Sequence, residues 1–135
     1  MDRNTLKTFE KSLMRCSGCA TFMDRFYAIF LASSPKIQEK FAGTDLIRQK
    51  RALRASLHLM LLVAGDGENG PEHYLKDLAE IHSSRQRNIG ADLYELWLNS
   101  LLTTVKESDP RCSPEIERAW EEVMRIGIRY LLAHY

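Results

Sequence analysis

Apolar residues recur every three to four positions along almost the whole chain, and no stretch alternates apolar with polar residues as a half-buried strand would. This period predicts helices joined by short breaks. The expected helices are one through Leu6, Phe9 and Leu13 that ends near Gly18, a second over about 22–30, a short third over 35–41, and longer ones over about 45–64, 71–84, 91–107 and 114–135. About seven helices without a strand predict an all-α fold.

Several of these helices begin with recognisable capping residues. Ser34 and Pro35 place an N-cap side chain directly before a first-turn proline, and the sequence at 113–114 repeats this order. Thr44 or Asp45 is expected to cap the long central helix. Breaks are expected where glycine, proline and polar residues gather, at 42–43, 65–70, 85–90 and 109–110.

Composition and charge restrict the possible classes of protein. The chain of 135 residues, with 44% hydrophobic and 27% charged residues, fits one domain over 1–135 whose core can also hold a cofactor. A formal net charge of +1 does not supply the basic field that nucleic-acid binding needs. No apolar run approaches the roughly 18 residues of a membrane span, and residues 1–12 are too polar for a secretory signal. We therefore expect a cytoplasmic location and no nucleic-acid or membrane partner.

The three cysteines, without a secretion signal, indicate reduced thiols. Cys16 and Cys19 form a Cys-Ser-Gly-Cys motif. Cys112 alone cannot supply the second ligand pair of a zinc site, and Ala20 stands where covalent haem attachment needs a histidine. Two interpretations stay open, a redox dithiol and two small residues at a helix junction.

His82 lies at the end of an apolar helix face. Leu75, Leu78 and Ala79 precede it by seven, four and three residues, so they share its side of the helix. A buried neutral imidazole must satisfy both ring nitrogens. A core or capping histidine is one interpretation, and a metal ligand whose second nitrogen bonds a carbonyl or hydroxyl is the other.

Two further polar residues lie on apolar helix faces. Gln49 precedes Leu53 by one turn on the buried side of the central helix, either as a boundary glutamine or as a polar group in a pocket. Tyr27 follows Phe26 in an otherwise apolar helix. Taken alone, it is an ordinary aromatic residue whose hydroxyl reaches the surface.

In order and spacing, these segments resemble the globins, specifically the bacterial single-domain and flavohaemoglobin-type globins. The resemblance covers nearly the whole chain. The aromatic pair at 26–27 is followed by a proline-opened helix to Phe41, as in these globins. The stretches 49–53 and 78–82 are similar to the family's distal and proximal segments. Tyr94 and Trp120, the latter after Ser113 and Pro114, also match the family's pattern.

The resemblance implies a globin fold around a pocket for haem b. By it, His82 is the proximal iron ligand and Phe41 stacks on the porphyrin face. Tyr27 and Gln49 donate hydrogen bonds to the bound gas, and Leu53 bounds the distal pocket. Tyr94 corresponds to a tyrosine that these globins place near the proximal histidine. A glutamate of the last helix often completes the hydrogen-bond network around that histidine. The remaining candidates are Glu121 and Glu122 for that glutamate, and Arg51, Arg85 and Arg87 for the haem propionates.

The function implied is reversible binding of O2, NO or CO, for oxygen storage or delivery or for NO detoxification. Repeated NO detoxification needs electrons, and the chain has no dinucleotide-binding fingerprint, so a partner reductase is required. The alternatives are a gas or redox sensor that signals to a partner and a haem-free globin-like regulatory domain. The protein is expected to be a monomer or a homodimer. In a homodimer, aromatic residues of the last two helices form the shared face instead of packing the core: Tyr94, Trp97, Trp120 and Tyr130.

Overall fold

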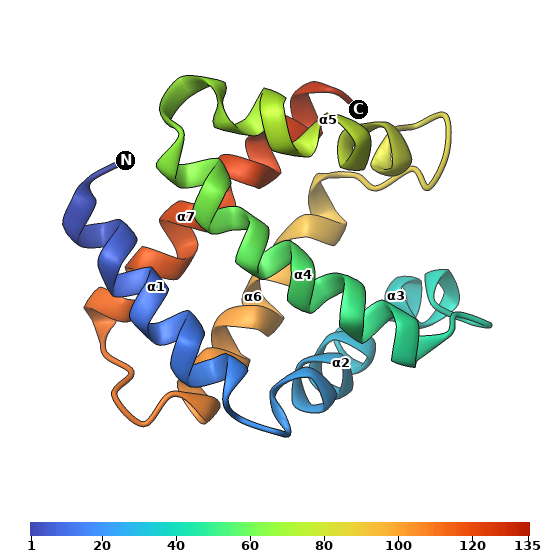
Figure 1. Ribbon diagram of the computed structural model, residues 1–135. Helices are drawn as coiled ribbons and strands as arrows, with labels where there is room; N and C mark the ends of the chain where they lie inside the picture. The colour runs from blue at the N-terminus through green and yellow to red at the C-terminus, as the bar shows by residue number, and fades with distance from the viewer.

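A computed structural model describes all 135 residues and contains seven α-helices, one 3-10 turn and no strand (Figure 1). The elements are α1 (Arg3–Ser17), α2 (Phe22–Ala32), α3 (Pro35–Lys40), α4 (Leu46–Gly65), η1 (Gly67–Asn69), α5 (Gly70–His82), α6 (Ala91–Ser108) and α7 (Pro114–Ala133). The predicted all-α class is confirmed, and the predicted helices match these seven to within a few residues at each end. The difference that matters for the site is at α5, which ends at His82 itself and not at residue 84.

Side-chain caps fix where four of the helices begin, and the first of them is Asp2, which accepts from the Thr5 amide at the start of α1. Ser34 and Ser113 accept hydrogen bonds from backbone amides of the first turns of α3 and α7. Asp45, and not Thr44, caps α4 by accepting from the amide of Arg48 at 3.3 Å. Each cap satisfies an amide that has no partner within its own helix.

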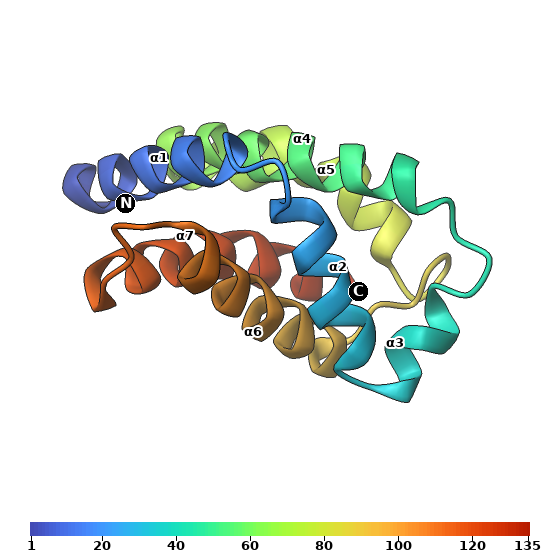
Figure 2. The same ribbon diagram turned by 90° about the horizontal axis from the view of Figure 1, so that it is seen from below.

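The helices pack in two crossed layers (Figures 1 and 2). In Figure 2, α1, α4 and α5 form the upper layer and α6 and α7 the lower one, with α2 crossing the end that leads to α3. The core is centred on Trp120 of α7, whose ring meets that of Phe9 on α1 edge to face at 4.9 Å. No helix is both long enough and apolar enough to cross a lipid bilayer.

A buried polar network holds α1 against the start of the α6–α7 connection. The Asp109 carboxylate accepts from Ser12 Oγ at 2.6 Å and from Arg15 Nε at 2.7 Å, and Ser12 Oγ in turn accepts from Trp120 Nε1 at 2.8 Å. Burial raises the pKa of Asp109, but the hydrogen bonds from Arg15, Ser12 and the Arg111 amide outweigh burial and lower that pKa to about 2. The residue expected only to stop α6 is therefore an ionised anchor between helices.

Gly70 sets the direction in which α5 leaves α4. A Cβ atom at this position would lie 2.0 Å from the carbonyl oxygen of Val63, so no other residue fits without displacing the backbone of α4. The close approach lets α5 begin inside the expected 65–70 break and run back along α4 and α7. This return brings His82, the last residue of α5, to a cavity that α4 also lines.

Candidate functional site

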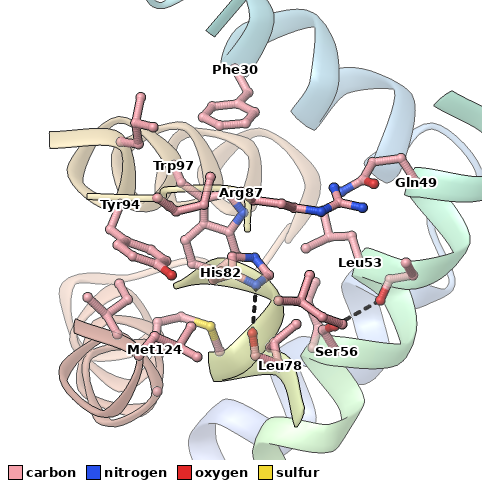
Figure 3. A pocket seen from close by; sticks show the side chains of 18 of the residues that line it. Phe30, Gln49, Leu53, Ser56, Leu78, His82, Arg87, Tyr94, Trp97 and Met124 are labelled. Atoms are coloured by element: carbon pink, nitrogen blue, oxygen red, sulfur yellow. Dashed lines mark hydrogen bonds between the residues drawn. The ribbon is translucent and has the colours of Figure 1, made fainter. Parts of the chain in front are cut away.

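A cavity of about 330 Å³ lies where α2 to α7 converge (Figure 3). Most of its wall is apolar. Its polar lining residues are Tyr27, Lys40, Gln49, Ser56, His82, Arg87, Tyr94 and Trp97. No aspartate or glutamate lines it. The cavity is therefore a largely apolar compartment with a few polar groups, the usual character of a cofactor or small-ligand site.

His82 closes one side of this cavity. Its Nδ1 lies 2.9 Å from the carbonyl oxygen of Leu78, drawn as a dashed line in Figure 3. Because a carbonyl can only accept, Nδ1 carries the proton and Nε2 keeps its lone pair. Burial lowers the pKa of His82 below its ordinary value, which favours the neutral imidazole. Nε2 makes no hydrogen bond within the protein, so the ring is prepared to bind a metal through this atom.

The side chains that line this cavity do not form the ligand set of a protein-bound metal ion. His82 is the only histidine on its wall, and no group of three or more histidine, cysteine, aspartate or glutamate side chains forms a metal site anywhere in the chain. An iron at His82 must therefore bring further ligands of its own. A porphyrin supplies four nitrogens and presents an apolar ring to apolar walls, so haem fits this donor set.

The opposite side of the cavity is formed by α2 and by the first turns of α4. Tyr27, Gln49 and Leu53 all line it, so the structure brings these predicted distal residues together. The Tyr27 hydroxyl donates to the backbone carbonyl of Gln49 at 3.5 Å, which is a long and weak hydrogen bond. Burial raises the pKa of Tyr27 to about 12, so the phenol stays protonated. The interpretation in which this hydroxyl reaches the surface is wrong, because Tyr27 is 3% exposed and lines the cavity.

Three aromatic rings pack on the side of the cavity next to α3. Phe41 follows the last residue of α3, and its ring lies 5.6 Å from that of Phe30 and 6.3 Å from that of Tyr27, centroid to centroid. All three side chains line the cavity. This cluster gives a flat bound group an aromatic wall beside the Tyr27 hydroxyl.

Two cations form one edge of the cavity. Lys40 ends α3 and donates from Nζ to the backbone carbonyl oxygen of Arg87 at 2.8 Å. The Arg87 side chain points across the opening toward the α4 side in Figure 3. Arg85, also expected to bind the haem propionates, does not line the cavity, because its guanidinium pairs with Glu80 on the exposed side of α5. Arg51 also lies outside the cavity. Lys40, which the sequence analysis missed, joins Arg87 on the rim in their place.

Tyr94 lies beside His82 with an unsatisfied hydroxyl. Their rings are nearly parallel, 23° apart, with centroids at 6.4 Å. Tyr94 is 7% exposed, and its hydroxyl is the only buried side-chain polar atom without a hydrogen-bond partner. Burial raises the pKa of this phenol well above its ordinary value. An orphan hydroxyl of this kind is typical of a cavity shaped for a bound group.

No glutamate of the last helix reaches Tyr94, so the expected carboxylate partner is absent. Glu121 faces away, with a carboxylate oxygen 4.0 Å from Arg125, and Glu122 is exposed. Met124 and Ile128 line the cavity from α7 instead. The side of the cavity around His82 is therefore more apolar than the resemblance implied.

The other residues noted in the sequence have ordinary packing positions. Trp120 is fully buried in the core, Trp97 lines the cavity, and Tyr130 donates to Glu72 on the surface. A second histidine of the chain, His58 on α4, bonds Ser17 Oγ at 2.8 Å and does not line the cavity. The three cysteines are free thiols, and Cys16 is buried.

Comparisons with known proteins agree with this arrangement. The globin family model matches residues 24–128. A crystal structure of the protein PA3967 from Pseudomonas aeruginosa PAO1, described as structurally highly homologous to a human hemoglobin, is 37% identical in sequence. It superposes with a TM-score of 0.90 over 97% of this chain and 98% of that one. Among curated proteins, none matches significantly. On its fold, its cavity and these matches, the chain belongs to the globin family.

Proposed function

We propose that this globin holds haem b through His82 and binds diatomic gases reversibly, O2 and NO first among them. The observation that carries the proposal is the state of His82. Its Nδ1 proton is donated to the Leu78 carbonyl, its Nε2 lone pair is unused, and it faces an apolar cavity with hydrogen-bond donors on the far side. Globins typically bind haem, and haem iron supplies the coordination site that a diatomic gas needs.

The residues on the two sides of the cavity would have different roles in holding the haem and the gas. His82 would bind and orient the iron from one side, since its hydrogen bond to Leu78 fixes both the tautomer and the ring direction. Tyr27 and Gln49 would donate hydrogen bonds to a gas bound on the other side. A donor in a water-poor cavity stabilises partial negative charge far better than one in water, so these donors should slow the release of O2 more than the release of CO, which carries less such charge.

The rim cations would orient the cofactor. Haem has one anionic edge, the two propionates, and the cavity has one cationic edge, made by Lys40 and Arg87. Because most of the remaining wall is apolar, the opposite orientation would leave the propionates against apolar side chains. Charge therefore selects one direction of insertion.

Enzymatic turnover is a conditional part of the proposal. His82 donates to a neutral carbonyl and no carboxylate lines the cavity, so His82 would give a bound iron little of the extra electron density that favours O–O cleavage. We therefore place gas binding first. Conversion of NO to nitrate would require a separate electron donor.

The test is the visible spectrum of the purified protein in ferric, ferrous and CO-bound forms, measured beside two variants. Wild type is expected to show an intense Soret band that shifts with CO. His82→Ala should lose haem or change its ligation, whereas His73→Ala, at an exposed histidine outside the cavity, should match wild type. A protein that takes up no added haem, or a His82→Ala spectrum identical to wild type, would overturn the proposal.

A further inference from the structure

The helix α4 has an unusual charge composition. It holds four of the 19 lysine and arginine residues of the chain and none of the 18 aspartate and glutamate residues, although every other α-helix contains at least one acid. The rest of the chain is therefore net negative. A small net charge for the whole protein conceals a basic helix.

Three of these four cations are exposed and unpaired. Lys50 pairs with Asp24 of α2 at 2.8 Å. Arg48, Arg51 and Arg54 follow one another at three-residue intervals on the outer side of α4, and none has a carboxylate oxygen within 4.0 Å. Three arginines elsewhere in the chain do pair with an acid of another segment: Arg15 with Asp109, Arg25 with Glu107 and Arg125 with Glu95. We call these three residues the arginine face.

The arginine face lies directly behind the candidate haem site. Gln49, Leu53 and Ser56 line the cavity from the inner side of the same turns of α4 that carry the arginines outside. An α-helix with its side chains is about 10 Å across, so a partner seated on the arginine face would lie one helix away from the cavity. Figure 1 shows α4 running across the front of the molecule with no other helix over it.

We propose that the arginine face is the docking surface for an acidic electron-transfer protein that reduces the iron. The inference rests on the proposed function, because only a haem site calls for an external electron. Unpaired cations beside a redox centre would attract an acidic carrier from a distance and orient it toward α4. One electron passes from the carrier to ferric iron, giving ferrous iron and the oxidised carrier, and no bond is made or broken.

The surface chemistry favours a protein over a lipid membrane. A helix that lies on a membrane needs a continuous apolar face beside its cations. The large exposed apolar residues of α4 are Ile47 (68% exposed) and Leu62 (52% exposed), separated by about 22 Å at the rise of an α-helix. An arginine cluster with apolar residues only at its ends suits the carboxylates of a protein surface.

The experiment uses the haem-loaded ferric protein and a fully reduced flavodoxin of acidic sequence as the probe. The second-order rate of reduction is followed at the Soret band from about 10 mM to about 1 M salt, over which the screening length falls from about 30 Å to about 3 Å. The test variant is the triple charge reversal Arg48→Glu, Arg51→Glu and Arg54→Glu. The matched control is Arg3→Glu, Lys7→Glu and Lys11→Glu, which makes the same charge change at exposed residues of α1 that have no salt-bridge partner.

Wild type should be reduced quickly at low salt, and the rate should fall steeply as salt rises. Reversal of the arginine face should slow the low-salt rate at least tenfold and flatten its salt dependence, and the α1 control should stay within about threefold of wild type. Reduction by dithionite, a small reagent that needs no docking, should be the same in all three proteins at about 1 M salt, where its negative charge is screened. Equal slowing of both triple variants would show a net-charge effect and overturn the proposal, as would an unchanged rate in both.

Two further measurements distinguish this proposal from the proposed haem function and from binding to a membrane. Calorimetric binding of flavodoxin to the chain at low salt needs no haem, so it tests the arginine face even if haem uptake fails and with it the proposed function. Sedimentation with vesicles of phosphatidylserine and phosphatidylcholine tests the membrane interpretation. Vesicle binding that the arginine-face reversal abolishes, with flavodoxin binding unchanged, would overturn the proposal in favour of a lipid surface.

Discussion

Two buried polar regions of this globin differ in whether their polar atoms have hydrogen-bond partners within the protein. At the α1–α7 end, the Asp109 carboxylate and its neighbours Ser12, Arg15 and Trp120 are joined by hydrogen bonds of 2.6 to 2.9 Å. In the cavity, the Tyr94 hydroxyl has no partner and His82 Nε2 accepts nothing from the protein. Burying an unsatisfied polar group costs free energy, so the first region stabilises the fold and the second weakens it. Polar atoms left without protein partners mark the place where a ligand supplies them.

The largest expected effect comes from removing Asp109, the centre of the hydrogen-bonded network between α1 and α7. Asp109→Ala leaves Arg15 without its counter-charge and Ser12 without its acceptor, so the free energy of unfolding should fall by about 3–5 kcal/mol. Urea unfolding followed by circular dichroism measures this. Asp92→Ala, which removes an exposed partner of Lys36, should cost less than about 1 kcal/mol. Similar losses in the two variants would show that the Asp109 carboxylate contributes no more to stability than an exposed ion pair does.

A pH titration sharpens the same contrast. The pKa of Asp109 is about 2 in the folded protein, below its ordinary value of 3.8, so its contribution is fully present above that ordinary value and is lost as pH falls toward 2. Wild type should lose about 2 kcal/mol more than Asp109→Asn between pH 5 and pH 2. Parallel stability curves for the two proteins would show that the carboxylate is not held ionised by its partners.

The smallest expected effect has the opposite sign and tests the cavity. Tyr94→Phe removes a buried hydroxyl that makes no hydrogen bond, so the haem-free protein should become more stable by about 1 kcal/mol. The matched control is Tyr130→Phe, which loses a hydrogen bond to Glu72 and should not stabilise. Thermal unfolding of the haem-free proteins measures both. A loss of stability in Tyr94→Phe would mean that the hydroxyl is satisfied after all.

Much of the candidate site follows from local sequence. The apolar face before His82 placed that residue at the inner end of a helix, and the one-turn spacing of Gln49 and Leu53 placed both on one side of α4. These positions obey helical geometry, which acts between neighbours three and four residues apart. The family resemblance joined these separate segments into one proposed pocket, and the structure brings their side chains to one cavity.

The rim and the surroundings of Tyr94 did not follow from sequence. Arg85 and Arg87 are two residues apart in one polar loop, yet Arg87 lines the cavity and Arg85 pairs with Glu80 outside it. Lys40 belongs to a different helix, and only the packing of α3 against the loop brings it to the rim. For Tyr94, the rotation of α7 decides that Met124 faces the cavity and that Glu121 does not.

The sequence by itself therefore determined the helices, some of their caps and the face of each helix that is buried, because these depend on short-range periodicity and on hydrogen bonds within a turn. Only the tertiary structure decided which polar atoms find partners, since Asp109, Ser12 and Trp120 meet across about a hundred residues of chain. It also decided which cations stay unpaired, because a charge on α4 is neutralised only by a neighbouring helix that presents an acid. Both outcomes depend on how rigid helices cross one another, which local sequence does not encode.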